Sequence, residues 1–464
     1  MAHTATPPAF PPYAPHHAHA LEKSVVRKVL LYLVPFIALQ YTFCMLDRSN
    51  VSIAALQMKP ELHMSDRVYG LGAGIFFLGY FLFEVPSNLI MERVGARWWI
   101  ARIMITWGAI SAAMMFVRSP LSFYSLRFLL GLAEAGFYPG IILYFTYWIP
   151  SNLRAQVIAR FLAITGLVGL IGAPLGSVLL GMKGTLGLAG WQWLFLMEGI
   201  PSILLGFVVF KIMPNGPKDA KWLTGEEKQW IAQRLEEEKS HTNRVEHMSV
   251  RVALTDPRII HVVLIFIITS TAGNAIGFFG PELVKARSGG LWSDSRVALL
   301  TGIPAVIGAI AMALAASHSD RSGRRNSHVA LGYMTAGLGF LGLVFAPTAP
   351  ITLFAWSINT LGERVAAGSY WAVTTNLMGA RAAAGGIAFI NSVGNLGGLI
   401  GPLIMGELKT RTHGGYTAGL YTATALYLIA AVLSAFLKRE QHSTPASDPL
   451  LAGGLAAASQ PEDA

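Results

Sequence analysis

Long apolar stretches alternate with short polar or charged turns along most of the chain. About 20 apolar residues are needed for a helix to cross the hydrocarbon of a bilayer, so each stretch predicts a transmembrane helix. The predicted spans are residues 29–55, 68–91, 98–117, 121–148, 154–182, 191–212, 258–283, 297–317, 328–346, 350–376, 382–408 and 416–437. The pattern therefore predicts an all-α membrane protein with twelve transmembrane helices.

Three polar segments interrupt this pattern. Residues 1–23 are rich in proline, alanine and histidine and lack the basic-then-apolar order of a cleavable signal peptide. We expect them, like residues 439–464, to form a disordered tail. Residues 213–257 predict a polar linker with a short helix, because the run from Thr224 to Glu227 has the order of a capping box.

The two remaining segments, residues 24–212 and 258–438, each hold six predicted helices and resemble each other. The loop sequence ERVGAR begins at residue 92, and its counterpart DRSGRR begins 228 residues later (320 − 92). An Arg-Ala pair and an LIGAP/LIGP match recur at nearly the same spacing. Each match lies at the same place in its half, which predicts parallel repeats with the substrate at the midplane between two six-helix bundles.

Composition and charge agree with a membrane protein. Of the 464 residues, 53% are hydrophobic and 13% are charged, whereas soluble proteins carry about 25% charged residues. Lysine and arginine in cytoplasmic loops explain the net charge of +10, so we expect no nucleic-acid partner. One cysteine, Cys44, allows neither an intrachain disulfide nor a cysteine-based metal cluster. We expect no cofactor, no metal and no enzymatic activity, because the sequence has no nucleophile with its base, no metal cluster and no phosphate loop.

The distribution of basic residues predicts the orientation. Several arginines fall in alternate loops, on the same side as both ends of the chain and the linker. The positive-inside rule places that side, with both termini, in the cytoplasm. The opposite loops hold fewer basic residues, namely Lys59, Arg67, Arg118, Lys183, Lys285, Arg287 and Arg296.

Charged residues inside the predicted spans are candidates for function. Asp47 and Arg48 lie in the first span, and Arg127 and Glu134 lie in the fourth. The seven-residue separation of Arg127 and Glu134 puts both on one helix face, roughly 10.5 Å apart along the axis. Ionisable residues inside a membrane usually face the bundle interior and mark substrate or proton routes, although two structural ion pairs are the alternative.

Their chemistry divides the roles. A carboxyl in a low-dielectric cavity can change protonation near neutral pH, whereas arginine stays charged and grips a carboxylate with a planar fork. We therefore assign Arg48 and Arg127 to an anionic substrate, and Asp47 and Glu134 to protons. Flanking residues that can contact substrate, or can instead be packed helix residues, are Tyr41, Tyr80, Trp371, Asn391 and Asn395. For Glu84 we expect a structural or gating pair.

The repeated loop motif has two possible roles. Acidic and basic residues with a glycine turn can hold one state closed by ion pairs, or can serve only to orient the hairpin. Its residues are Glu92, Arg93, Gly95 and Arg97 in the first half, and Asp320, Arg321, Gly323 and Arg324 in the second.

These motifs together resemble a known family. The stretches LDRSNVSIAAL, GYFLFEVPSNLIMERVGARWWIARIMITWG, RFLLGLAEAGFYPG, GWQWLFLMEGIP, DAKWLTGEEKQW and INSVGNLGGLIGP are similar to the anion:cation symporter branch of the major facilitator superfamily, and most closely to its bacterial tartrate-transporter-like members. The resemblance implies a bacterial inner-membrane protein with proton-linked Asp47 and Glu134, and with Arg48, Arg127 and Tyr80 at the anion.

The sequence thus predicts a proton-coupled importer of a small organic anion, such as a tartrate-like hydroxy, dicarboxylic or sugar acid, that works by alternating access. Its partners are protons, the anion and the lipid bilayer, and we expect a monomer. Sugar-acid relatives carry a polar amide in the fifth span where this chain has Thr165, which leaves an aromatic acid or allantoate as alternative substrates. A non-transporting membrane sensor is the alternative from another class.

Overall fold

The computed structural model describes residues 15–165, 168–242, 256–322 and 325–437, and the part it describes is helical throughout, without strands. Its α-helices are α1 (Pro15–Tyr32), α2 (Val34–Glu61), α3 (Asp66–Val94), α4 (Ala96–Ala113), α5 (Pro120–Glu134), α6 (Phe137–Thr146), α7 (Ser151–Thr165), α8 (Val168–Gly181), α9 (Gly190–Ile212), α10 (Gly225–Thr242), α12 (Pro257–Arg287), α13 (Asp294–Leu300), α14 (Gly302–Ser322), α15 (Arg325–Phe345), α16 (Ala349–Asn395), α17 (Gly397–Arg411) and α18 (Thr417–Ala435). The predicted all-α class is confirmed.

Ten stretches of the described residues are long and apolar enough to cross a membrane. They correspond to all the predicted spans except the fifth and the tenth, which lie in α7 with α8 and in α16. The count of twelve is consistent with this arrangement and stays a prediction.

Three predicted boundaries differ from the structure. The fourth span is broken after Glu134, because Gly136 adopts a left-handed φ of 83° where a side chain would collide with Ser87. The predicted break between residues 376 and 382 lies inside the continuous helix α16. The predicted N-terminal tail, residues 1–23, overlaps α1, which is described from Pro15 and buries Leu21 in the core of the first half.

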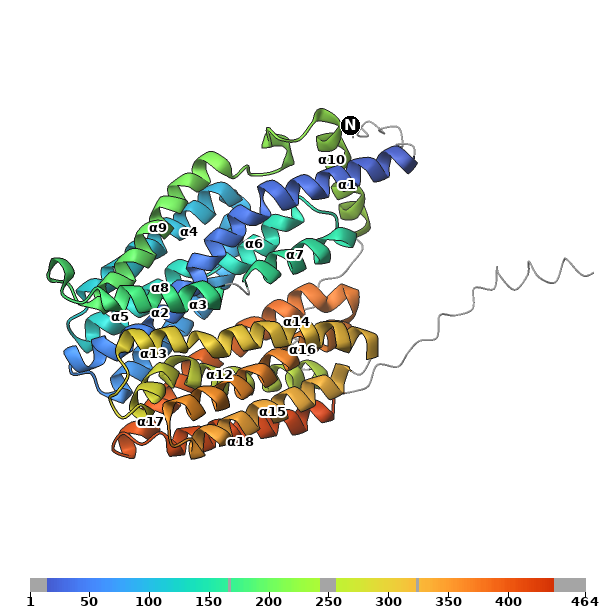
Figure 1. The fold of residues 1–464 in the computed structure, drawn as a ribbon. Coiled ribbons are helices and arrows are strands. Elements are labelled where there is room, and N and C mark those ends of the chain that lie inside the picture. The colour runs from blue at the N-terminus through green and yellow to red at the C-terminus, as the bar shows by residue number, and fades with distance from the viewer. Residues whose placement is uncertain (1–14, 166–167, 243–255, 323–324, 438–464) are drawn as a thin grey trace, which may run out of the picture.

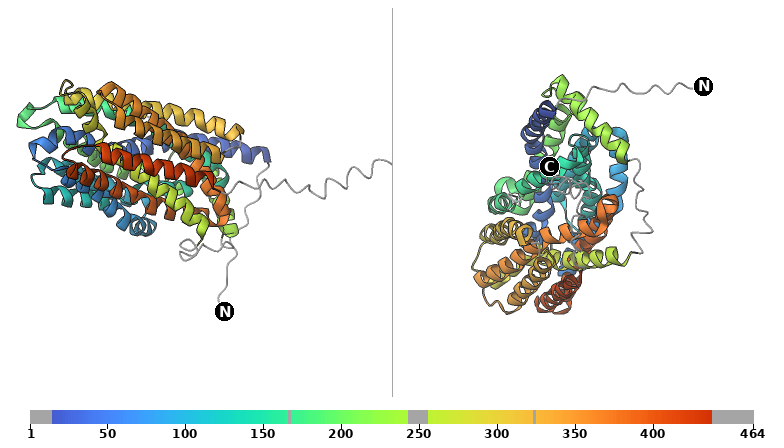
Figure 2. Two further views of the ribbon diagram at one scale, coloured as in Figure 1. Left: turned by 90° about the horizontal axis from the view of Figure 1, so that it is seen from below. Right: turned by 90° about the vertical axis from the view of Figure 1, so that its right-hand side faces the viewer.

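The helices form two groups that follow the predicted duplication. Figure 1 shows α1 to α10 in the upper half and α12 to α18 in the lower half, and the end view in Figure 2 separates them again. Within the halves, α4 packs on α9 as α15 packs on α18. Between the halves, α3 packs on α17 as α8 packs on α13 and α14. Equivalent helices therefore make equivalent contacts, as expected for a repeated unit.

The linker helix α10 packs against α1, at one end of the bundle that we call the linker end (Figure 1). The predicted capping box is confirmed: the Thr224 amide donates to Glu227 Oε2 at 2.8 Å, and the Glu227 amide donates to Thr224 Oγ1 at 3.3 Å. Ser24 and Lys28 of α1 both donate to the same carboxyl at 2.7 Å. One carboxylate thus caps α10 and fixes it to α1.

The halves also touch at the opposite end, which carries the turn at residues 62–65 and which we call the far end. There α3 and α17 cross so closely that a side chain at Gly70 would collide with the Pro402 carbonyl, and one at Gly406 with the Asp66 carbonyl. The Tyr69 hydroxyl also donates across the halves to the Phe278 carbonyl at 2.9 Å. The far end is therefore closed by backbone contact between the halves.

Candidate functional site

The first buried charge group lies where α2 faces the break between α5 and α6. Arg48 Nε donates to Glu134 Oε1, and Cys44 Sγ donates to the same oxygen at 3.1 Å. Glu134 is fully buried and is the last residue of α5, so the helix break positions its carboxyl against α2. Cys44 and Arg48 are four residues apart and share one helix face, which brings both to Glu134.

Asp47 is also fully buried but faces the other way, into the first half. Its carboxyl accepts hydrogen bonds from Ser111 at 2.5 Å, from the Trp107 indole at 2.7 Å and from Asn50 at 3.2 Å. No lysine or arginine of the described chain lies within ion-pair distance of it. The adjacent residues Asp47 and Arg48 therefore do not pair with each other, and neutral donors hold the Asp47 carboxyl.

Arg127 takes a third arrangement. It donates from Nε to the Gly72 carbonyl at 3.3 Å and from Nη2 to the Ala73 carbonyl at 3.1 Å, both on α3. Its guanidinium lies 4.9 Å from the centre of the Phe76 ring, and that of Arg48 lies 5.6 Å from the same ring. Arg127 and Glu134 occur seven residues apart as the sequence indicates, but Glu134 pairs with Arg48.

Each of the two arginines retains an unused donor. Arg48 Nη2 and Arg127 Nη1 are buried and have no hydrogen-bond partner in the described part of the chain. The Tyr80 ring lies 4.6 Å from the Arg48 guanidinium, so Tyr80 belongs to the same group. The site thus presents two guanidinium groups that share the face of Phe76, beside a carboxylate that neutralises one of them.

Three further residues that were predicted to contact substrate are Tyr41, Trp371 and Asn395. Tyr41 packs on the rings of Tyr138 and Phe161, at 5.5 Å and 5.4 Å between centres. Trp371 packs on Phe266 in the second half, at 5.4 Å. Asn395 is the last residue of α16.

Glu84 makes a contact between the halves. Its carboxyl accepts a hydrogen bond from Ser392 on α16 at 2.5 Å and lies beside Asn391. The structural or gating role expected for Glu84 stays a prediction. Asn391 is thus placed on the boundary between the two halves, where the duplication predicts the substrate.

The loop motif of the first half is attached to its own half. Gly95 has a φ of 91°, which ends α3 and starts α4. Arg97 donates through its amide to Asn215 at 3.1 Å and through Nε to the Met213 carbonyl at 2.6 Å, which ties the turn to the start of the linker. Glu92 and Arg93 are exposed. In the second half Arg321 is exposed, whereas Gly323, Arg324 and the side chain of Asp320 lie outside the described residues, as does the side chain of Thr165.

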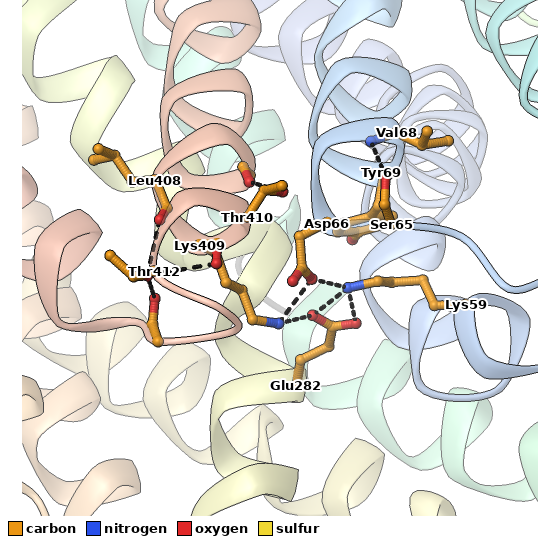
Figure 3. Close-up of polar contacts among 12 residues, drawn as sticks. Lys59, Ser65, Asp66, Val68, Tyr69, Glu282, Leu408, Lys409, Thr410 and Thr412 are labelled. Atoms are coloured by element: carbon orange, nitrogen blue, oxygen red, sulfur yellow. Dashed lines mark hydrogen bonds and ion pairs between the residues drawn. The ribbon is translucent and has the colours of Figure 1, made fainter.

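Four charged residues form a second group at the far end, which we call the charge ring (Figure 3). Lys59 lies 2.6 Å from Asp66 and 2.5 Å from Glu282, and Lys409 lies 2.8 Å from Asp66 and 3.3 Å from Glu282. Lys59 and Asp66 belong to the first half, and Glu282 and Lys409 to the second. Two of the four ion pairs therefore join the halves, and the charges balance.

The comparisons with known proteins agree with this architecture. The sequence profile of the Major Facilitator Superfamily matches residues 37–402, with a second match over residues 262–459. The chain belongs to the major facilitator superfamily. As a member, it is a multi-pass membrane transporter and not an enzyme.

Individual relatives cover nearly all of this transporter. A protein of Agrobacterium vitis named "Putative tartrate transporter" is 45% identical over 90% of this chain and 92% of its own length. The "Quinolone resistance transporter" of Acinetobacter baumannii is 36% identical over 91% of this chain and 97% of its own. A crystal structure of a bacterial homolog of the human lysosomal transporter Spinster has a TM-score of 0.72 at 19% identity, over 89% of this chain and 97% of that one. That structural likeness supports the fold of the transporter.

The sequence reasoning missed several residues of this major facilitator protein. The charge ring was absent from the predicted site, although Lys59 is among the basic residues of the predicted opposite loops, which was an available signal. Phe76, which lies under both arginines, looked like one aromatic residue among many. Glu198 stands in the family motif GWQWLFLMEGIP and is 2% exposed, but received no role.

Proposed function

We propose that this transporter imports a small organic anion together with protons by alternating access, with a tartrate-like acid as the favoured substrate. The observation that carries the proposal is the pair of guanidinium groups over Phe76, each with an unused buried donor. Arginine forks bind carboxylates in a bidentate way, so these donors suit an organic acid. The 45% identity to a protein named as a tartrate transporter supports the choice of acid.

Protonation of Glu134 supplies the coupling. In its charged form, Glu134 neutralises Arg48, and the anion has to compete with it for the guanidinium. A proton on Glu134 removes that competition and leaves Arg48 charged for the substrate, because arginine keeps its proton. Anion and proton therefore enter together, and loss of the proton returns Glu134 to Arg48 and expels the anion. Asp47 is the second proton-linked carboxyl.

The charge ring supplies the gate on one side. If the positive-inside rule sets the orientation, the linker end with both termini is cytoplasmic in a bacterial inner membrane, and the far end faces outward. The ring then closes the outer side, and its two ion pairs between the halves must break for substrate to enter. Glu84 and Ser392, nearer the midplane, form a further contact that changes in each cycle.

The test is uptake into proteoliposomes. Labelled tartrate and labelled 4-hydroxyphenylacetate are offered with an inward proton gradient and again after the gradient is collapsed. The proposal predicts accumulation of tartrate that requires the gradient, and accumulation of the aromatic acid instead would support the alternative substrate class. Accumulation that is indifferent to the gradient would overturn the coupling. Binding of an acid without any flux would favour the sensor.

A further inference from the structure

Glu198 is a buried carboxyl that the proposed cycle does not use. It lies on α9 and is 2% exposed, and its Oε2 has no hydrogen-bond partner in the described part of the chain. Backbone contact brings α9 close to α4, since a side chain at Gly199 would collide with the Gly108 carbonyl. An uncompensated charge at such a site costs several kcal/mol, so a carboxyl here requires a partner or a proton.

Asn50 connects this carboxyl to Asp47. The Asn50 side chain lies beside the Glu198 carboxyl and donates from Nδ2 to Asp47 Oδ1 at 3.2 Å, while its own Oδ1 is buried without a donor. The Asn50 nitrogen carries two N–H groups, which charged carboxyls accept, whereas its Oδ1 accepts from a carboxyl only when that carboxyl carries a proton. The unused Asn50 Oδ1 and the unused Glu198 Oε2 are the two atoms that such a proton would join.

The hydrogen bonds distinguish the two carboxyls. Asp47 accepts from Trp107, Ser111 and Asn50, a set of donors that suits a charged carboxylate. Glu198 has an oxygen with no donor, which suits a protonated carboxyl whose O–H donates. Two neighbouring carboxyls in a dry interior do not both ionise readily, because their charges repel.

We propose that Asp47 and Glu198 form one proton-holding pair, linked by Asn50, in which Glu198 holds the proton in the arrangement seen here. In this arrangement the Glu198 O–H donates to Asn50 Oδ1, and Asn50 Nδ2 donates to charged Asp47. Rotation of the amide reverses both bonds, so that protonated Asp47 donates to Oδ1 and Nδ2 donates to charged Glu198. The pair carries one proton and one negative charge in either arrangement.

The surroundings of the pair contain few other charges. From α4 the neighbours are neutral: Trp107 and Ser111 donate to Asp47. From α9, Ser202 lies beside Asp47, and its hydroxyl donates to the Glu198 backbone carbonyl at 3.1 Å. Charged groups on another element that interact electrostatically with Asp47 are Glu134 and Arg127 of α5. This inference rests on the proposed role of Asp47 in proton coupling and extends it to a second residue.

Infrared spectroscopy of the full chain in lipid nanodiscs tests the pair without any substrate. The carboxylic-acid C=O band is followed from acidic to alkaline buffer in the wild type, in Glu198→Gln and in Asp47→Asn. At neutral pH we expect Glu198→Gln to lose the part of this band that belongs to Glu198. The loss of this band with rising pH should end in a final titration step. The midpoint of that step should move to lower pH by about one unit or more in both variants, because strongly interacting carboxyls titrate together. The exposed carboxyl variant Glu226→Gln should leave band and midpoint unchanged.

Two outcomes would overturn the inference. An unchanged carboxylic-acid band in Glu198→Gln would show that Glu198 holds no proton. An unmoved final titration step in Asp47→Asn would show that the two carboxyls titrate independently, and this variant carries the test if Glu198→Gln fails to fold. Neither result depends on uptake, so failure of the transport assay and failure of the pair are distinguishable.

Discussion

The charge ring and the buried cluster around Arg48 differ in charge balance. The ring has two lysines and two carboxylates, each within 3.3 Å of both partners of opposite sign. The interior of the first half has Arg48 and Arg127 against four buried carboxyls, Asp47, Glu84, Glu134 and Glu198. Of these, Arg48 and Glu134 form the ion pair that the described residues show.

The difference indicates what each group is suited to do. A balanced ring is satisfied as it stands and gains nothing from a ligand or a proton, so it suits a contact that is made or broken as a whole. In the unbalanced cluster, arginine N–H groups remain available to bind an anion, and carboxyls remain available to bind protons. Substitutions in the two groups should therefore have different kinds of effect.

The largest effect is expected from Glu134→Gln. An inward gradient of about one pH unit supplies about 1.4 kcal/mol for each coupled proton, enough for about tenfold accumulation. The variant cannot release a proton at this position, so accumulation through it should be lost while exchange of substrate across the membrane persists. Accumulation and exchange are measured in the same proteoliposomes, with Glu226→Gln as the exposed-carboxyl control. Accumulation as in the wild type would remove Glu134 from the coupling.

The next effect is expected from Arg127→Lys, which keeps the charge but loses the fork. The two hydrogen bonds to α3 carbonyls and the unused Nη1 cannot all be replaced by one ammonium group. Hydrogen bonds to charged groups contribute about 1.5 to 3 kcal/mol, so the KM for the anion should rise at least about tenfold. Uptake over a range of substrate concentrations measures it. An unchanged KM in a folded variant would place the anion elsewhere.

Lys409→Gln removes one positive charge from the ring and should affect transport less than Glu134→Gln or Arg127→Lys. Asp66 and Glu282 are left with Lys59 alone, so the far end should open more often. Cys44, the single cysteine, is fully buried beside Glu134 and serves as the reporter. A membrane-impermeant maleimide added at the far end should label it several-fold faster in this variant.

The matched control for the ring is Arg411→Gln, two residues away on α17. Arg411 pairs with Glu407 at 2.8 Å, but its side chain is 72% exposed, and such pairs contribute about 0.2 to 1 kcal/mol. We expect wild-type labelling of Cys44 in this control. Equal labelling rates in Lys409→Gln and Arg411→Gln would mean that the backbone crossings of α3 and α17 hold the far end closed without the ring.

The difference between the two regions also shows what the sequence can predict. Residues such as Arg48 and Glu134 are conspicuous because charge is costly inside an apolar span, and the spans follow from hydropathy. Their partners are less predictable: Asp47 lies next to Arg48 in sequence, yet the helix turns its carboxyl toward α4. The break after Glu134 had a local signal in Gly136 and Pro139, but the apolar pattern continues across it.

The ring was not predictable from local sequence for a different reason. Its members stand at helix ends, where a charged residue is ordinary, and Lys59 meets Glu282 only because the two halves pack together. No pattern within either half specifies that packing. Glu198 is an intermediate case, since a glutamate in an apolar span is conspicuous but its neighbours come from the turns of α2 and α9.

The smallest effect on transport is expected at a third charged site, where a balanced pair lies away from both the cluster and the ring. Burial alone would raise the pKa of the Glu227 carboxyl, but hydrogen bonds from Lys28, Ser24 and the Thr224 amide outweigh it and hold that pKa below its usual value. A carboxyl with a lowered pKa stabilises the docked α10 above the ordinary glutamate range, and this stabilisation is lost as pH falls through the lowered pKa. Hydrogen exchange in α10, corrected for intrinsic rates, should therefore accelerate in acid in the wild type, and should be fast and nearly independent of pH in Glu227→Gln. In Glu227→Gln, uptake should change less than about twofold, because a balanced peripheral pair binds neither the anion nor the transported proton. A loss of coupling as large as in Glu134→Gln would show that charge balance does not separate the structural groups from the functional ones.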